Sequence, residues 1–79
     1  MNDQQIIALF QEAVAEVDGN VKLGEMTAKT ELASLGLDSV MTMEVIGVME
    51  EKLNVRFPDE DLATLKNMGD LTTLVSRLS

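Results

Sequence analysis

The C-terminal segment of the chain has the most regular hydrophobic pattern in the sequence. Its aliphatic residues recur at helical spacing: Leu71, Leu74, Val75 and Leu78. Such spacing places them along one side of an α-helix, and burying each side chain contributes roughly 1.5–3 kcal/mol. Because the 79 residues include no cysteine, no disulfide can stabilise the chain, and packing between helices must do so. We therefore expect one all-α domain over residues 1–79.

A first helix is predicted near the N-terminus. Asn2 can cap it, with Gln5 three residues later as the capping-box partner, and the apolar periodicity continues to about Val17. The Asp-Gly-Asn stretch at residues 18–20 should end this helix, because glycine and asparagine tolerate left-handed backbone. Residues 21–38 show weak periodicity. We expect them to form a long ordered loop, which is uncommon in a compact domain and often functional.

Three more helices are expected after that loop. One spans residues 39–53, and a short one runs from Pro58 to roughly Leu65. Gly69 and Asp70 introduce the last helix. The predicted fold is thus a small all-α bundle of three main helices and one short helix. Four residues form the expected inward stripe of the helix over 39–53: Val45, Ile46, Met49 and Leu53.

The charge balance narrows the possible partners. Acidic residues outnumber basic ones by 14 to 6, for a net charge of −8. Such a surface repels nucleic-acid backbones and anionic lipid, so we expect neither as a partner. It would attract proteins with basic patches, although on charge alone solubility is the simpler explanation. The apolar runs are too short to span a bilayer, and the start lacks the basic flank of a signal peptide, so we expect a soluble cytoplasmic protein.

No metal site is expected. The chain has no histidine or cysteine, so the usual zinc and haem ligands are absent. The segment over residues 18–22 superficially resembles a calcium loop, but Lys22 and Leu23 occupy the positions that require an oxygen ligand and a glycine. The acidic run at residues 59–61 is explained by the preference of helix starts for acidic side chains.

Ser39 follows Asp38 at the start of the helix predicted over residues 39–53. A serine nucleophile needs a base, and the chain has no histidine. A serine–lysine pair is possible in principle, but no spacing suggests one, so we expect no catalytic activity. As a bare dipeptide, Asp-Ser indicates only a helix cap. The lysines considered for such a pair are Lys22, Lys29, Lys52 and Lys66.

One face of the same helix combines apolar and acidic residues. We call it the docking face: Val40, Met43, Glu44, Gly47, Glu50 and Glu51. A core stripe would not contain the glutamates, and a solvated face would not need Val40 and Met43. Apolar contact with charge around it is typical of a protein-binding surface. Gly47 costs about 1 kcal/mol relative to alanine in mid-helix, and close helix packing and a role in docking explain it equally well.

Residues 35–53 resemble the acyl carrier proteins. The resemblance lies in Gly36-Leu37-Asp38-Ser39-Val40, followed by Glu44 and Glu50-Glu51. The later segments Phe57-Pro58-Asp59-Glu60 and Met68-Gly69-Asp70-Leu71 match the starts of the third and last helices of that family. The resemblance covers essentially the whole chain, and it implies the four-helix bundle of acyl carriers.

The resemblance also implies a function. Ser39 would carry 4′-phosphopantetheine, transferred from coenzyme A by a separate phosphopantetheinyl transferase, and the chain would hold acyl intermediates as thioesters on that arm. Asp38 would cap the helix and be recognised by the transferase. The phosphate would lie near a helix N-terminus, which favours anions. The docking face would bind partner enzymes with basic patches, such as acyltransferases and ketosynthases, and the carrier would be a monomer.

Departures from the family pattern bear on the pathway. Met41, Leu37 and Gly47 differ from the residues usual in fatty-acid carriers. The Gly-Leu-Asp-Ser context looks more like polyketide-type carriers, so we expect a freestanding carrier of a polyketide-type or other specialised pathway. The alternatives are a fatty-acid carrier, a D-alanyl or peptidyl carrier, and an unmodified acidic module that only binds proteins. Peptidyl carriers usually have Gly-Gly-x-Ser, which disfavours them. Some members of the family fold the acyl chain between the helices, and the Met-rich core is compatible with that.

Overall fold

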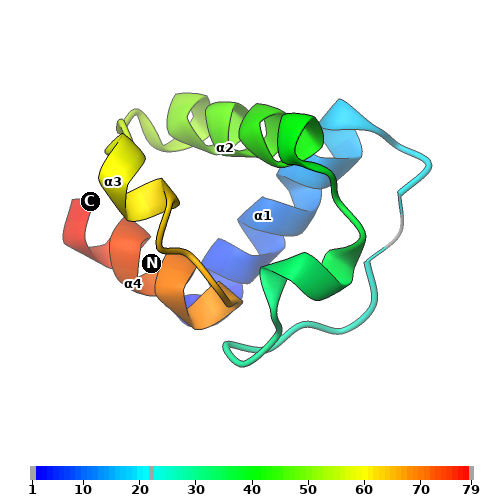
Figure 1. Ribbon diagram of the computed structural model, residues 1–79, viewed down its shortest axis with the longest axis horizontal. Coiled ribbons are helices and arrows are strands. Elements are labelled where there is room, and N and C mark those ends of the chain that lie inside the picture. The colour runs from blue at the N-terminus through cyan, green and yellow to red at the C-terminus, as the bar shows by residue number, and fades with distance from the viewer. Residues whose placement is uncertain (1, 22, 79) are drawn as a thin grey trace.

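The computed structural model of the chain describes residues 2–21 and 23–78, and helices make up its regular structure (Figure 1). Figure 1 shows α2 along one side of the molecule and α1 and α4 on the other, with α3 at one end and the long loop at the opposite end. The predicted all-α bundle is confirmed. The elements are α1 (Asp3–Val17), the 3₁₀-helix η1 (Leu32–Leu35), α2 (Ser39–Leu53), α3 (Asp59–Leu62) and α4 (Met68–Leu78).

Helix α1 begins as predicted but ends differently. The Asn2 side chain accepts a hydrogen bond from Gln5 N at 2.8 Å, and Asn2 N donates to the Gln5 side chain at 2.9 Å. The helix does end at Val17, but the left-handed ending was wrong. Asp18 is extended, with φ −151°, and its carboxylate accepts a hydrogen bond from Asn20 N at 3.0 Å. This Asx turn replaces the left-handed residue.

The loop between α1 and α2 contains η1, which the sequence did not predict. Gly36, with φ 75°, ends η1 in the left-handed region that glycine favours. The loop is also fastened to the start of α4 by backbone hydrogen bonds. These run from Leu32 N to Lys66 O at 2.9 Å, from Met68 N to Thr30 O at 2.9 Å and from Gly69 N to Ala28 O at 2.7 Å.

The boundaries of α3 and α4 correct two further predictions. Helix α3 ends at Leu62 rather than Leu65, because Thr64 N bonds to Asp61 O, three residues back, and the Thr64 hydroxyl donates to the same oxygen at 2.9 Å. Helix α4 begins at Met68, so it already includes Gly69 and Asp70.

A reciprocal cap explains why α4 starts early. Asp70 N donates to Asn67 Oδ1 at 2.9 Å, and Asn67 N donates to Asp70 Oδ2 at 3.2 Å. This arrangement has the logic of a capping box, in which two residues three apart each satisfy a free backbone N–H group of the other.

The core lies between α1, α2 and α4. Val45, Ile46 and Met49 face it as predicted, whereas Leu53 is only half-buried. None of the helices in the described part of the chain is long and apolar enough to cross a bilayer. The remaining buried hydrophobic residues are Ile6, Ile7, Phe10, Ala13 and Val14 on α1, Phe57 after α2, and Met68, Leu71, Leu74 and Val75 on α4.

Candidate functional site

Asp38 caps α2, as predicted. Its backbone is extended, and its side-chain Oδ1 accepts a hydrogen bond from Met41 N at 2.7 Å. Its carbonyl oxygen accepts from Thr42 N at 2.9 Å and from the Thr42 hydroxyl at 2.8 Å. Asp38 therefore acts as an N-cap residue, because its side chain accepts from Met41 N and its carbonyl accepts the first backbone hydrogen bond of the helix.

Ser39 is the first residue of α2, and its side chain is exposed. No described residue makes a hydrogen bond to its hydroxyl. The dipeptide does mark a helix cap, but the capping residue is Asp38 and not Ser39. The N–H groups of Ser39 and Val40 precede the first backbone hydrogen bond of α2, which Thr42 N makes. The site thus combines a free hydroxyl with two open N–H donors at the positive end of a helix.

The lysines considered as bases do not reach this hydroxyl in the part of the chain that the structure describes. Lys52 points from the far end of α2 to α1, where its Nζ lies 2.7 Å from Glu16 Oε2. Lys22 lies outside the described residues, both as a candidate base and as a position of the segment that resembles a calcium loop. Across residues 2–21 and 23–78, no group of three or more acidic side chains is arranged to hold a metal ion.

The docking face is arranged on α2 beside Ser39. Val40 and Met43 are the two large hydrophobic side chains that are exposed among the described residues, at 68% and 57%. Glu44 and Glu51 are exposed as well. A Cβ added to Gly47 would meet no atom within 4 Å. Close packing inside the chain therefore does not explain this glycine, which removes one of the two explanations considered above.

Glu50 differs from the other acidic residues of the docking face. It is half-buried, and its Oε2 accepts a hydrogen bond from Phe57 N at 2.7 Å. Asn54, in left-handed backbone with φ 55°, ends α2 between these two residues. Glu50 therefore holds the segment that turns Phe57 into the core. This contact could not be predicted from the sequence, because the two residues are seven apart and the donor is a backbone group.

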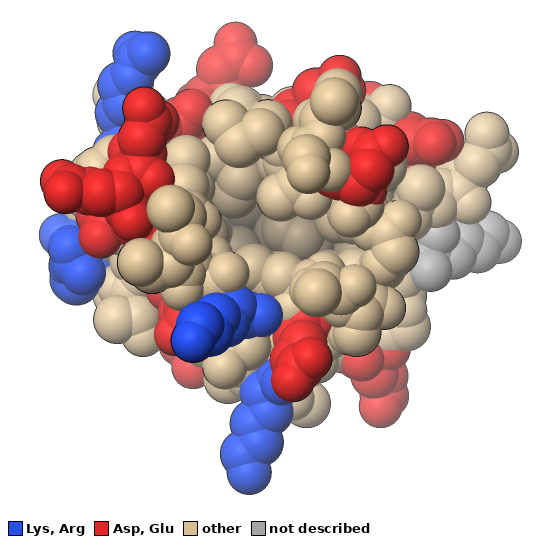
Figure 2. Space-filling view, in the orientation of Figure 1, with Lys and Arg blue, Asp and Glu red and all other residues tan. Residues whose placement is uncertain are grey.

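An apolar cavity of about 170 Å³ adjoins the docking face. Figure 2 shows a hollow in the middle of this side of the molecule, surrounded by uncharged side chains. Leu37, directly before Asp38, and Thr42, three residues after Ser39, line the cavity. Sequence reasoning did not locate it, because five separate segments form its wall. Other lining residues are Phe10, Leu32, Met43, Ile46 and Leu62.

Comparisons with known proteins cover the whole site. A family model described as the phosphopantetheine attachment site matches residues 8–75. The meromycolate extension acyl carrier protein of Mycobacterium leprae is 35% identical over 79 residues, which is 99% of this chain and 68% of that protein. An acyl carrier protein of Rhodococcus erythropolis is 36% identical over 76 residues, 95% of this chain and 82% of that protein.

A solved structure is similar over the same extent. The crystal structure of an acyl carrier protein from Thermotoga maritima matches with a TM-score of 0.86 at 25% sequence identity, covering 98% of this chain and 89% of that one. The similarity therefore includes the start of α2, the docking face and the elements around the cavity.

Proposed function

The chain belongs to the acyl carrier protein family, which carries 4′-phosphopantetheine, and from that premise we propose that Ser39 is the attachment residue. The observation that supports this assignment is the state of its hydroxyl. It is exposed and unpartnered among the described residues, at the first position of α2 and directly after the cap. A hydroxyl that the fold does not use is open to an enzyme that modifies it.

The residues around Ser39 fit a phosphodiester. The free N–H groups of Ser39 and Val40 and the dipole of α2 favour an anion there. The Asp38 carboxylate is turned to Met41 N by its capping bond. When bound, the group supplies the terminal thiol that a chain without cysteine cannot provide. No described residue is hydrogen-bonded to the Ser39 hydroxyl as a base would be, so we assign its activation to the loading transferase.

The apolar cavity is the proposed place for the acyl part of the cargo. Its wall includes Leu37, Thr42 and Met43, all within four residues of Ser39. Each methylene group that enters such a cavity gains about 0.8 kcal/mol. A cavity of about 170 Å³ has room for a short acyl segment rather than for a long chain in its entirety.

The pathway is a finer proposal. The mycobacterial relatives are named for meromycolate extension. We therefore place this carrier in a chain-extending pathway of the specialised lipid or polyketide type.

The docking face is the proposed contact with partner enzymes. Exposed Val40 and Met43 supply apolar area beside Ser39, and the Glu44 and Glu51 carboxylates attract basic patches. Glu50 has a second role within the fold through Phe57 N. The partners would be the transferase and the acyl-processing enzymes, such as acyltransferases and ketosynthases, and the carrier would act as a monomer in the cytoplasm.

Intact-mass spectrometry tests the assignment of Ser39. The purified chain is incubated with coenzyme A, Mg²⁺ and a broad-specificity phosphopantetheinyl transferase. We expect the wild type to gain the mass of one phosphopantetheinyl group, and Ser39→Ala to gain none. Ser76→Ala, which removes an exposed hydroxyl from α4, is the matched control and should be modified like the wild type. A folded wild type that stays unmodified, or a modified Ser39→Ala, would contradict the proposal.

A further inference from the structure

Gly47 leaves a recess on the docking face. It lies four residues after Met43, whose exposed side chain forms the raised part of that face. Apart from Gly47, its two neighbours in the chain and the nearby backbone of α2, no atom lies within 4 Å of the place where a Cβ would be. The recess continues toward the end of α2 as an open groove of about 500 Å³. The groove is lined by Gly47, Glu50, Glu51, Asn54, Val55 and Arg56.

The fold itself has no use for a glycine at this position. Gly36 is the glycine with positive φ in the described part of the chain, so Gly47 does not serve an unusual backbone conformation. A Cβ added to Gly47 would meet no side chain and no other segment within 4 Å. Glycine is also among the least favourable residues in a helix interior. The unfilled space is therefore better explained by something outside the chain that enters it.

The recess lies within reach of an enzyme that acts on Ser39. Gly47 is eight residues beyond Ser39 on α2, which corresponds to about 12 Å along a helix. A protein interface of ordinary size covers about 800 Å² on each partner, equal to a disc of about 16 Å radius. Val40, Met43 and Gly47 follow at spacings of three and four residues, so they share one side of the helix.

We propose that the recess at Gly47 receives an arginine or lysine side chain from the phosphopantetheinyl transferase. This inference rests on the proposed function, because loading of Ser39 is its context. The aliphatic part of such a side chain would pack over Gly47 and Val55, and its charged end would reach the exposed Glu51 carboxylate.

The charges of the groove agree with a basic occupant. Glu50 and Glu51 give it two carboxylates, and Arg56 is its one cationic side chain among the described residues. Glu50 Oε2 already accepts a hydrogen bond from Phe57 N. Glu51 is therefore the carboxylate that remains to pair with an incoming cation. Because Gly47 has no side chain, the aliphatic part of the incoming side chain can lie close to the backbone of α2.

The test fills the recess and measures loading kinetics with coenzyme A, Mg²⁺ and a broad-specificity transferase. Gly47→Leu should raise KM about tenfold with little change in kcat, as expected when an interface contact is lost. Gly47→Ala should raise KM less, yet raise Tm by about 4–8 °C, because alanine is the better helix residue. Higher stability with poorer loading separates a binding role from damage to the fold.

A double-mutant cycle identifies the occupant. Glu51→Gln should also raise KM, and the increase for Gly47→Leu/Glu51→Gln should be smaller than the product of the single effects, because both residues contact one side chain. An unchanged KM for Gly47→Leu would overturn the proposal. Independent effects of the two residues would also overturn it, since they would indicate an apolar occupant.

A control and the wild type complete the design. Gly24→Leu changes a loop glycine that also has open space around it and should load like the wild type. Wild-type protein that is not loaded at all would contradict the proposed function. Equal loading of the wild type and Gly47→Leu would contradict only the role of the recess.

Discussion

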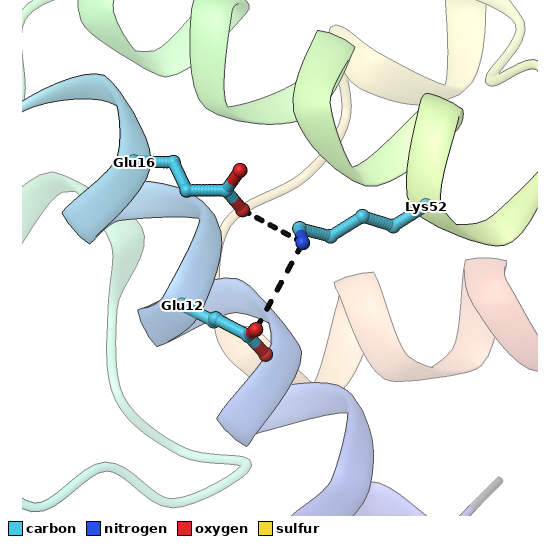
Figure 3. Close-up of polar contacts among 3 residues, drawn as sticks. All are labelled: Glu12, Glu16 and Lys52. Atoms are coloured by element: carbon cyan, nitrogen blue, oxygen red, sulfur yellow. Dashed lines mark ion pairs between the residues drawn. The ribbon is translucent and has the colours of Figure 1, made fainter.

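Lys52 Nζ on α2 lies 2.7 Å from Glu16 Oε2 on α1, and 3.9 Å from Glu12 Oε1 one helical turn away (Figure 3). Lys52 is the only basic residue in the sequence of α2. Because its ammonium group is held against α1, it forms no ion pair with the described carboxylates of the docking face. The same ion pairs join two helices that build the core.

The Lys52 ion pairs should make part of the stability depend on pH. The hydrogen bond to Glu16 is the main reason that the pKa of Lys52 is raised above its ordinary value of 10.5, and the nearby charges of Glu16, Glu12 and Glu51 add to it. A raised pKa in the folded state means that the stabilisation is complete below pH 10.5 and is lost as the pH rises through the folded-state pKa. The difference in Tm between the wild type and Lys52→Met should therefore close in strong alkali.

Lys29→Met is the control for this experiment. Lys29 is exposed and forms no ion pair with a described residue, so its replacement should leave Tm almost unchanged at every pH. A difference between the wild type and Lys52→Met that stayed constant into strong alkali would rule out the assigned ion pair as its source.

Asp38 should contribute to stability and to loading separately. Asp38→Ala removes the acceptor for Met41 N, and loss of an N-cap costs about 1 kcal/mol. Asp38→Asn keeps a capping oxygen, so its free energy of unfolding in urea should stay near that of the wild type. If the transferase recognises the negative charge of Asp38, the Asp38→Asn variant will be loaded slowly although it is stable. Rapid loading of Asp38→Asn would limit this residue to its structural role.

Gly69 should be intolerant of a side chain. A Cβ there would lie 3.0 Å from Ala28 O, the oxygen that Gly69 N itself bonds at 2.7 Å, and 3.2 Å from Asn67 Oδ1. The loop would have to move away from α4, so Gly69→Ala should lower the free energy of unfolding in urea by about 1–3 kcal/mol. Gly47→Ala, also in a helix but with open space, should raise it by about 1 kcal/mol. Equal effects of the two changes would show that the approach at Ala28 is unimportant.

Cargo length should affect stability if the acyl chain enters the cavity. Hexanoyl-loaded protein should have a higher Tm than acetyl-loaded protein, because each methylene group buried contributes about 0.8 kcal/mol. Ala33→Phe, which enlarges an exposed residue lining the cavity, should abolish that difference. Ala15→Phe on the exposed side of α1 should preserve it. Identical Tm values for the two cargoes in the wild type would place the chain outside the cavity.

The acidic side chains of the docking face should govern the rate of association. Glu44→Lys or Glu51→Lys should slow binding to the transferase at low salt and flatten its salt dependence, since charge steering is screened over about 8 Å at physiological ionic strength. Stopped-flow measurement of the on-rate gives the comparison. Glu25→Lys makes the same charge change at an exposed loop residue and should have a smaller effect. Equal slowing by all three variants would indicate net charge rather than a defined surface.

Local signals in the sequence predicted local structure well. The Asn2–Gln5 capping box, the Asp38 cap and the end of α2 at Asn54 each depend on residues within four positions of one another. The start of α4 also depends on two residues three apart, Asn67 and Asp70, which cap the helix reciprocally. The start at Met68 could therefore have been predicted from the sequence. Such features can be predicted because the hydrogen-bond donor and its acceptor lie in one short segment.

Contacts between distant segments were missed for a physical reason. The bond from Phe57 N to Glu50 and the bond from Gly69 N to Ala28 O both use backbone groups, which every residue has. No residue type therefore marks them in the sequence. The cavity was missed because its wall includes Phe10, Leu32 and Leu71 from different elements. The position of Ser39 was predicted by its motif, but the freedom of its hydroxyl required the structure.

Asp38 and Ser39, at the start of α2, have separate roles. Asp38 caps α2, whereas the Ser39 hydroxyl oxygen makes no hydrogen bond to a described residue. Under the proposed assignment, esterifying that oxygen would break no hydrogen bond of the described structure. The capped start of α2 would then keep its hydrogen bonds in the bare and the loaded carrier.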